Sequence, residues 1–144
     1  MEQLIAATKS SDWKTRRDAV NTLGELEDPR GMPALAARAL YDDNLHPRWR
    51  SLWAMSAVDR EGGDAMPILL DGLENDVPIV ERNAAVALAF FSRTEATPEL
   101  IRGLTDADEF RRWEAVFSLR ELGSPEVQGV LIPLLAESAE PASR

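Results

Sequence analysis

Apolar and small positions recur with helical spacing in two kinds of segment that alternate along the chain. The first kind is typified by "TRRDAVNTLG" from Thr15, and similar segments begin at Pro47, Val80 and Arg111, about 32 residues apart. Spacing of three and four residues predicts one buried face on each of four helices. Two columns of small residues and one of large apolar residues make up this face: Ala19, Ser51, Ala84 and Ala115; Thr22, Ala54, Ala87 and Ser118; Leu23, Met55, Leu88 and Leu119.

The second kind of segment lies between copies of the first and is typified by "MPALAARAL" from Met32. Its leucine column has five members, Leu4, Leu35, Leu69, Leu100 and Leu131. Turn sequences such as "EDPRG", "REGGD" and "GSP" separate the segments, and Gly and Pro end and begin helices. The chain is therefore predicted to form nine short helices joined by tight turns.

The repeat determines the expected architecture. A helix pair of this size cannot bury its apolar face alone, so neighbouring pairs must stack. We predict an all-α fold, an α-solenoid of about four and a half helix pairs, as a single domain over residues 1–138. The tail over residues 139–144, "EPASR" at its end, is expected to fray.

The segment "DWKTRRDAVNTLGELEDPRGMPALAAR", which begins at Asp12, resembles the HEAT-like repeat of the phycobilisome-lyase type. That repeat has an Asp, then Val-Arg, paired alanines, Ala-Leu-Gly, an Asp-Pro turn and a Pro-x-Leu helix. The tetratricopeptide and ankyrin patterns are absent. The resemblance covers almost the whole chain. It implies a right-handed α–α superhelix in which the first kind of helix lines the concave side.

The repeats depart from the family's Asp-to-Arg spacing in two places. Asp12 with Arg16, and Asp108 with Arg112, keep that spacing. The second repeat has one extra residue before Arg48, and the third has a glutamate where the arginine is expected, at position 81. An unbroken ladder of Asp–Arg pairs is therefore not expected.

Residues between the core columns are expected to face the concave side. Three such columns hold Arg17, Trp49, Arg82 and Trp113; Asp18, Arg50, Asn83 and Glu114; and Asn21, Trp53, Val86 and Phe117. Aromatic and arginine side chains are the usual anchors of protein recognition. We therefore predict a partner-binding groove; the alternative is that the rings fill gaps between repeats or pack under a terminal segment. The candidate partner-binding residues are Trp13, Arg17, Trp49, Arg50, Trp53, Arg82, Phe110, Trp113 and Phe117.

The composition argues against several kinds of chemistry. The chain has no cysteine and one histidine, His46, so no zinc site is expected. His46 precedes a proline at a predicted helix start and is expected to be a surface or capping residue. No G-x-S-x-G elbow or phosphate-binding loop occurs. The neighbouring aspartates are expected to cap loops rather than bind metal: Asp42, Asp43, Asp106 and Asp108.

Charge and hydropathy bear on partners and location. The chain has 16 basic and 25 acidic residues, a net charge of −9, which disfavours binding to nucleic acid. Its longest apolar run, "AAVALAFF", is too short to cross a bilayer. The absence of cysteine fits a cytoplasmic protein. The last predicted helix, "PEVQGVLIPLLAE", has an apolar side that leaves the oligomeric state open.

These observations favour a non-enzymatic scaffold that binds a protein or peptide in its groove, with no catalytic residue, metal or cofactor. The arginines would meet acidic or carbonyl groups of the partner. The alternative, which the name of the repeat suggests, is a bilin lyase subunit or a phycobilisome-associated factor. In that case tryptophan and arginine would hold a tetrapyrrole and its propionates.

Overall fold

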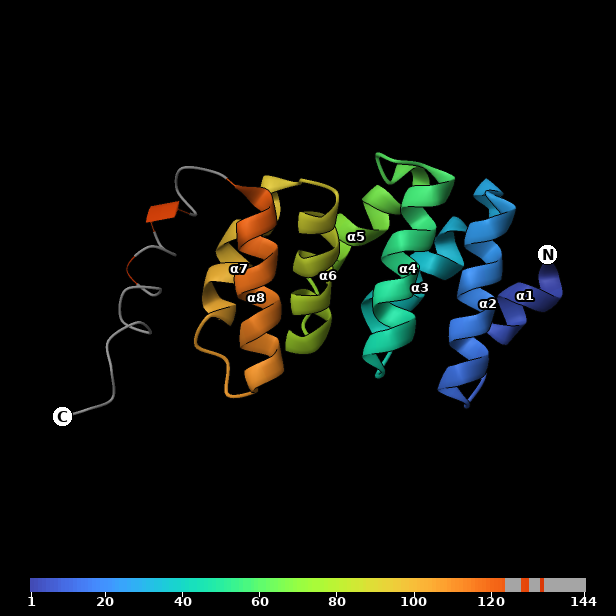
Figure 1. Ribbon diagram of the computed structural model, residues 1–144, viewed down its shortest axis with the longest axis horizontal. Helices are drawn as coiled ribbons and strands as arrows, with labels where there is room; N and C mark the ends of the chain where they lie inside the picture. The colour runs from blue at the N-terminus through green and yellow to red at the C-terminus, as the bar shows by residue number, and fades with distance from the viewer. Residues whose placement is uncertain (124–127, 130–132, 134–144) are drawn as a thin grey trace.

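The computed structural model describes residues 1–123, 128–129 and 133, and in this part of the chain all regular structure is helical (Figure 1). Three single 3₁₀ turns, Pro29–Gly31, Gly63–Ala65 and Thr94–Ala96, precede α3, α5 and α7. The ninth predicted helix lies almost wholly outside the described residues, and so does Leu131 of its leucine column. The predicted domain end at residue 138 and the tail over residues 139–144 also lie outside them. The helices are α1 (Glu2–Ala7), α2 (Trp13–Leu26), α3 (Met32–Tyr41), α4 (Leu45–Val58), α5 (Met66–Gly72), α6 (Pro78–Phe90), α7 (Thr97–Gly103) and α8 (Glu109–Leu122).

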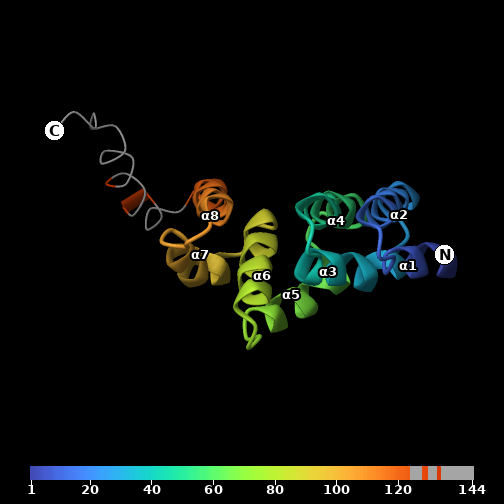
Figure 2. The same ribbon diagram turned by 90° about the horizontal axis from the view of Figure 1, so that it is seen from below.

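The helices form two layers that correspond to the two kinds of segment. Figure 2 shows α1, α3, α5 and α7 on one side, and α2, α4 and α8 on the other. In the same view α2, α4 and α8 are seen nearly end-on, whereas α6 is seen obliquely, so its axis is tilted against theirs. The alternating pairs are those of an α-solenoid, as predicted, and its right-handed sense stays a prediction.

The predicted core columns are buried. The large apolar column of the first kind of segment has no exposed surface: Leu23, Met55, Leu88 and Leu119. In the second kind of segment, Leu35, Leu69 and Leu100 of the leucine column are equally buried. Leu4 and Thr22 are only partly buried. Small residues allow close approach: a Cβ atom added at Gly24 would lie 2.9 Å from the Ala54 Cα. Here α2 and α4 pack nearly backbone to backbone.

Polar side chains set the starts of three of the four longer helices. Asp12 accepts hydrogen bonds from two backbone amides of α2, and Asn44 and Asp108 each accept one, in α4 and α8 respectively. Such caps satisfy amides that have no partner within the helix. Helix α6 differs, because its N-cap residue Val77 makes no side-chain cap. The third repeat is thus irregular at its start as well as in its arginine position.

The stack opens between the second and third repeats. Helix α2 packs along α4, and α4 packs along α3, but the backbones of α4 and α6 are not closely packed. These two helices meet through side chains, as Trp53 and Phe90 do. Helix α6 packs instead against α3, α5, α7 and α8. The space between α4 and α8, over α6, is where the candidate functional site lies.

Candidate functional site

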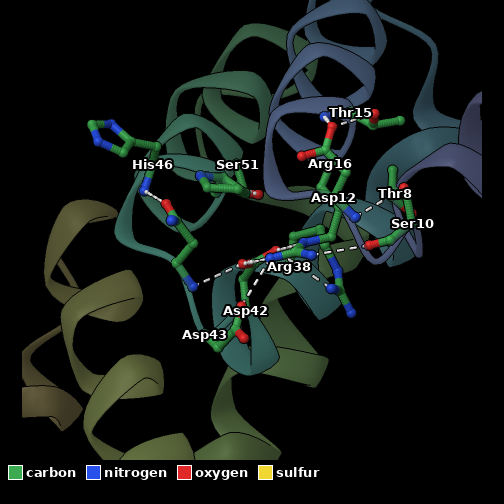
Figure 3. A network of polar contacts seen from close by, with 12 residues as sticks. Thr8, Ser10, Asp12, Thr15, Arg16, Arg38, Asp42, Asp43, His46 and Ser51 are labelled. Carbon is green, nitrogen blue, oxygen red and sulfur yellow. Dashed lines mark hydrogen bonds and ion pairs between the residues drawn. The ribbon is translucent and has the colours of Figure 1, made fainter.

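A buried ion pair joins the first two repeats (Figure 3). The Nε and Nη2 atoms of Arg16 each donate to a carboxylate oxygen of Asp42 at 2.9 Å. Its Nη1 donates to the backbone carbonyls of Ser10 and Ser11 at 2.9 and 3.2 Å. Hydrogen bonding to Asp42 raises the pKa of Arg16. Since every donor group of Arg16 is used within the protein, this cluster is structural.

The aspartate that precedes each arginine does not pair with it. Asp12 caps α2, and the partner of Arg16 comes from the following repeat. Arg112 repeats part of this arrangement, because its Nη1 donates to the carbonyls of Asp106 and Ala107 at 2.8 and 3.2 Å. Three of the four loop aspartates act as caps, as expected, because Asp42, Asp106 and Asp108 each accept from a backbone amide. Asp43 does not, since its carboxylate accepts from Arg16 Nη2 at 2.8 Å instead.

Arg48 breaks the pattern and reaches across to α8. Its Nη1 donates to Glu114 Oε1 at 2.7 Å, and both side chains are buried. The indole Nε1 of Trp49 donates to the same oxygen at 2.9 Å. Glu114 was expected to face the groove, and this prediction is wrong, because the glutamate has no exposed surface. The carboxylate instead fixes the orientation of the Trp49 ring.

Two further polar side chains complete this buried network. Arg111 Nη1 donates to Glu114 Oε2 at 3.2 Å and to Asn83 Oδ1 at 2.6 Å. Asn83 Nδ2 donates to the Leu40 carbonyl at 2.8 Å, so the prediction that Asn83 faces the groove is also wrong. Burial, with the charge of Arg48 beside it, lowers the pKa of Arg111 despite the opposing effect of Glu114. Buried charges require such partners, and here they connect α3, α4, α6 and α8.

Beside this network lies a pocket of about 240 Å³, which we call the aromatic pocket. Helices α4 and α8 form its two sides, and α6 forms its floor, where Val86 and Ala89 are each 2% exposed. Its lining residues are Trp49, Trp53, Val86, Ala89, Phe90, Ser92, Phe117, Ser118 and Glu121. The pocket exists because α6 is set back: it lies nearer the layer of α5 and α7 than α4 and α8 do, and its axis is tilted relative to theirs (Figure 2).

Aromatic rings meet in pairs around the pocket. Trp49 and Phe117 meet edge to face with centroids 5.9 Å apart, and Trp53 and Phe90 do so at 5.1 Å. Trp113 stacks on Phe117 at 5.2 Å, so a ladder of rings extends along α8. Trp53 and Trp113 remain 62% and 52% exposed. These are large apolar surfaces that nothing in the described chain covers.

A family model for HEAT repeats matches residues 1–89 and 66–144, which together span the chain. The chain belongs to the HEAT-repeat family. HEAT repeats generally serve as protein-interaction scaffolds. No curated protein matches the chain. No helix in the described part of this HEAT-repeat protein combines the length and hydrophobicity needed to cross a membrane.

The pocket gathers three of the nine predicted site residues, Trp49, Trp53 and Phe117. Trp113 and Phe110 continue the ring ladder along α8, with the Phe110 and Trp113 centroids 5.8 Å apart. The HEAT-repeat stack therefore places Trp49 and Trp53 of α4 in one pocket with Phe117 of α8, more than 60 positions further along the sequence.

The remaining predicted site residues lie elsewhere. Trp13 stacks on His46 at 5.3 Å, and the Arg17 guanidinium lies 5.4 Å from the Trp13 ring while pairing with Asp18 at 2.8 Å. Arg82 is mostly buried and pairs with Glu99 at 2.9 Å. Arg50 lines a neighbouring space, the polar hollow, on the other side of Trp53. The residues of this hollow are Asn21, Gly24, Glu25, Glu27, Arg50, Trp53, Ala54 and Ala57.

Sequence reasoning missed Phe90 and Glu121, although a signal for both was present. They follow Val86 and Phe117 by four residues, so extending the third groove column by one helical turn finds them. The same extension gives Glu25 and Ala57, which line the polar hollow. Arg48 and Glu114 carried no comparable signal, because their pairing depends on how far α6 is set back.

Proposed function

We propose that this HEAT-repeat protein is a non-enzymatic scaffold that binds a protein or peptide segment at the aromatic pocket. The observation that carries the proposal is Trp53, 62% exposed at the side of a pocket whose other rings are held in place. Exposed tryptophans beside a concave site are typical anchors of protein recognition. Rings that are already ordered lose little conformational entropy when a partner binds.

The rings divide into two roles. Trp49 is half-buried and hydrogen-bonded to Glu114, so it shapes the pocket and also supports the fold. Phe117 lies between the Trp49 and Trp113 rings. Trp53 and Trp113 extend into solvent, and neither makes a polar contact that would explain its place in the fold. The reading of these rings as gap fillers therefore suits Trp49 better than it suits Trp53 or Trp113.

The alternative role, a bilin lyase subunit of the phycobilisome-lyase type, has less support. A tetrapyrrole would need cations for its propionates. Among the described lining residues of the aromatic pocket none is basic, and one, Glu121, is acidic. Arg17 and Arg82 are paired with carboxylates of the protein itself. Arg50 is the one predicted arginine in a neighbouring space, and Glu25 and Glu27 share that space with it.

Selection of a random peptide library against the full chain tests the proposal. Peptides that bind should lose affinity by about thirtyfold or more when Trp53→Ala removes the exposed anchor. Tyr41→Ala is the matched control, because Tyr41 is 55% exposed but lies at the end of α3 in the other layer. Its effect on affinity should be negligible, and the circular dichroism of both variants should match the parent.

Titration calorimetry with the selected peptides gives the affinities. Peptides that bind the parent chain and Trp53→Ala equally would overturn the proposal. A selection that enriches no peptide would do the same.

A further inference from the structure

We propose that the aromatic pocket takes an alkylammonium group on an aliphatic stem, as carried by a lysine or a methylated lysine of the partner. This inference rests on the proposed function and specifies the chemistry of the partner. It follows from the lining of the pocket, the charges around it and its size.

Four aromatic rings line one small space. Trp49, Trp53, Phe90 and Phe117 come from three helices, and no other described pocket gathers as many rings. The faces of indole and phenyl rings attract cations, tryptophan most strongly, and the attraction grows as water is excluded. Val86 and Ala89 give the floor an apolar surface against which methylene groups can pack.

The charged groups around the pocket favour a cation over an anion. Glu121 is the exposed carboxylate of the lining. The other side-chain polar groups there are the hydroxyls of Ser92 and Ser118 and the indole N–H groups of Trp49 and Trp53, of which that of Trp49 is bonded to Glu114. The polar hollow on the far side of Trp53 adds Glu25 and Glu27 against one arginine. Over the whole chain the net charge is −9, which attracts basic partners and repels acidic ones.

The buried network has one more cation than carboxylate, which opposes this preference in part. Arg48 and Arg111 lie near the pocket, but both are engaged by Glu114 and neither lines it. A pocket of about 240 Å³ is also smaller than the sites that usually hold drug-sized ligands, so it suits one side chain. An apolar side chain would contact the rings and leave the Glu121 carboxylate unused. A lysine uses both.

Short peptides that differ at one residue test this. The probes are acetyl-Gly-Ser-X-Ser-Gly-amide, where X is lysine, trimethyllysine, norleucine or glutamate. Binding to the full chain is followed by the indole N–H resonances of Trp49 and Trp53, assigned from Trp→Phe variants. The lysine or trimethyllysine peptide should bind about two- to thirtyfold more tightly than the norleucine peptide, which lacks the cation. The glutamate peptide should bind most weakly.

Comparison of the two cationic probes identifies the source of the ammonium group. Tighter binding of trimethyllysine indicates a methylated partner, and equal or weaker binding indicates an unmodified lysine; both outcomes support the proposal. Norleucine binding as tightly as the better cationic probe would overturn it, as would no response to any probe. The library selection with Trp53→Ala is independent of these probes, so the scaffold function can survive either failure.

The variant Glu121→Gln tests the carboxylate. It should weaken binding of the cationic peptides about two- to fivefold and leave binding of the norleucine peptide unchanged. Glu109→Gln, an exposed carboxylate on the same helix that does not line the pocket, is the matched control and should change neither. Equal effects of Glu121→Gln on the lysine and norleucine peptides would contradict a role for its charge.

Discussion

The junction between α2 and α4 and the junction among α4, α6 and α8 are built from the same repeat but differ in packing. At the first, Gly24 lets two helices approach backbone to backbone, and the Arg16–Asp42 pair links consecutive repeats. At the second, the backbones of α4 and α6 are not closely packed, and Arg48 of α4 pairs with Glu114 on α8. The closed junction is held by close backbone packing, whereas the open one is held by a buried polar network and leaves the aromatic pocket.

Small changes in sequence account for this difference. Ser56 of α4 stands where the first repeat has Gly24, and its side chain leaves less room for α6 to approach than a glycine would. Val77 stands where the other three long helices have a capping Asp or Asn, and Glu81 stands where they have an arginine. Each change removes a feature that would place α6 as α4 is placed. A repeat can therefore gain a pocket by losing regular packing.

The largest expected effect comes from breaking the buried network of the open junction. Glu114→Ala leaves Arg48 and Arg111 buried beside each other without their shared carboxylate. Loss of one partner from a buried pair typically costs about 3–5 kcal/mol. Urea denaturation should show a loss of this size in the free energy of unfolding, and the Trp49 indole N–H resonance should move upfield. Glu109→Ala, at an exposed site on α8, should change stability by less than about 0.5 kcal/mol.

The close approach at the first junction gives the next largest effect. In Gly24→Ala the new methyl would meet the Ala54 backbone, which cannot swing aside. Overpacking of this kind costs about 1–3 kcal/mol, against a gain of about 1 kcal/mol from alanine's helix propensity. Net destabilisation should appear in thermal and urea unfolding.

Ser56→Ala is the matched variant at the open junction. Ser56 is half-buried, and its hydroxyl bonds only within α4, to the Trp53 carbonyl. The same measurements should show a change within about 0.5 kcal/mol. Equal losses in both variants would mean that the two junctions pack alike.

A smaller effect is expected from restoring the missing cap of α6. Val77→Ser places a hydroxyl at an N-cap residue whose backbone is already extended and whose side chain is 50% exposed. Removing an N-cap side chain typically lowers the free energy of unfolding, so adding one here should raise it, by about 0.5–1 kcal/mol. Asp12→Ala at the start of α2 should lower it by about the same amount. A loss of stability in Val77→Ser, measured by urea denaturation, would show that the uncapped start is required by its surroundings.

The smallest effect concerns pH at the third repeat. A hydrogen bond to Glu99, and partial burial, raise the pKa of Glu81 above its ordinary 4.5. The folded protein thus holds this proton to higher pH than the unfolded chain does, so the contribution of Glu81 to stability falls as pH rises above 4.5. Glu81→Gln mimics the protonated form. It should stabilise the protein more at pH 7 than at pH 5, where urea midpoints of the two proteins should be closer. The reverse order would contradict the raised pKa.

Much of the fold could be predicted because the repeat is local information. Leu23, Met55 and Leu88 occupy one column of the aligned segments, and the structure buries all three without exposed surface. Which positions are exposed follows from the columns only where the stack is regular. Asn83 and Glu114 share a column with the exposed Asp18 and Arg50, yet the irregular third repeat buries them.

The sequence by itself determined the helices, their pairing and the residues that form the core, because helical periodicity and turn residues act over a few positions. It also placed the aromatic side chains on helix faces outside the core columns. Only the tertiary structure decided that Arg48 pairs with Glu114, 66 residues away, and that Trp49, Phe90 and Phe117 line one pocket. The reason is physical: these contacts depend on the position of α6 relative to α4 and α8. That position is set by the sum of packing contacts on four helices and by no single segment.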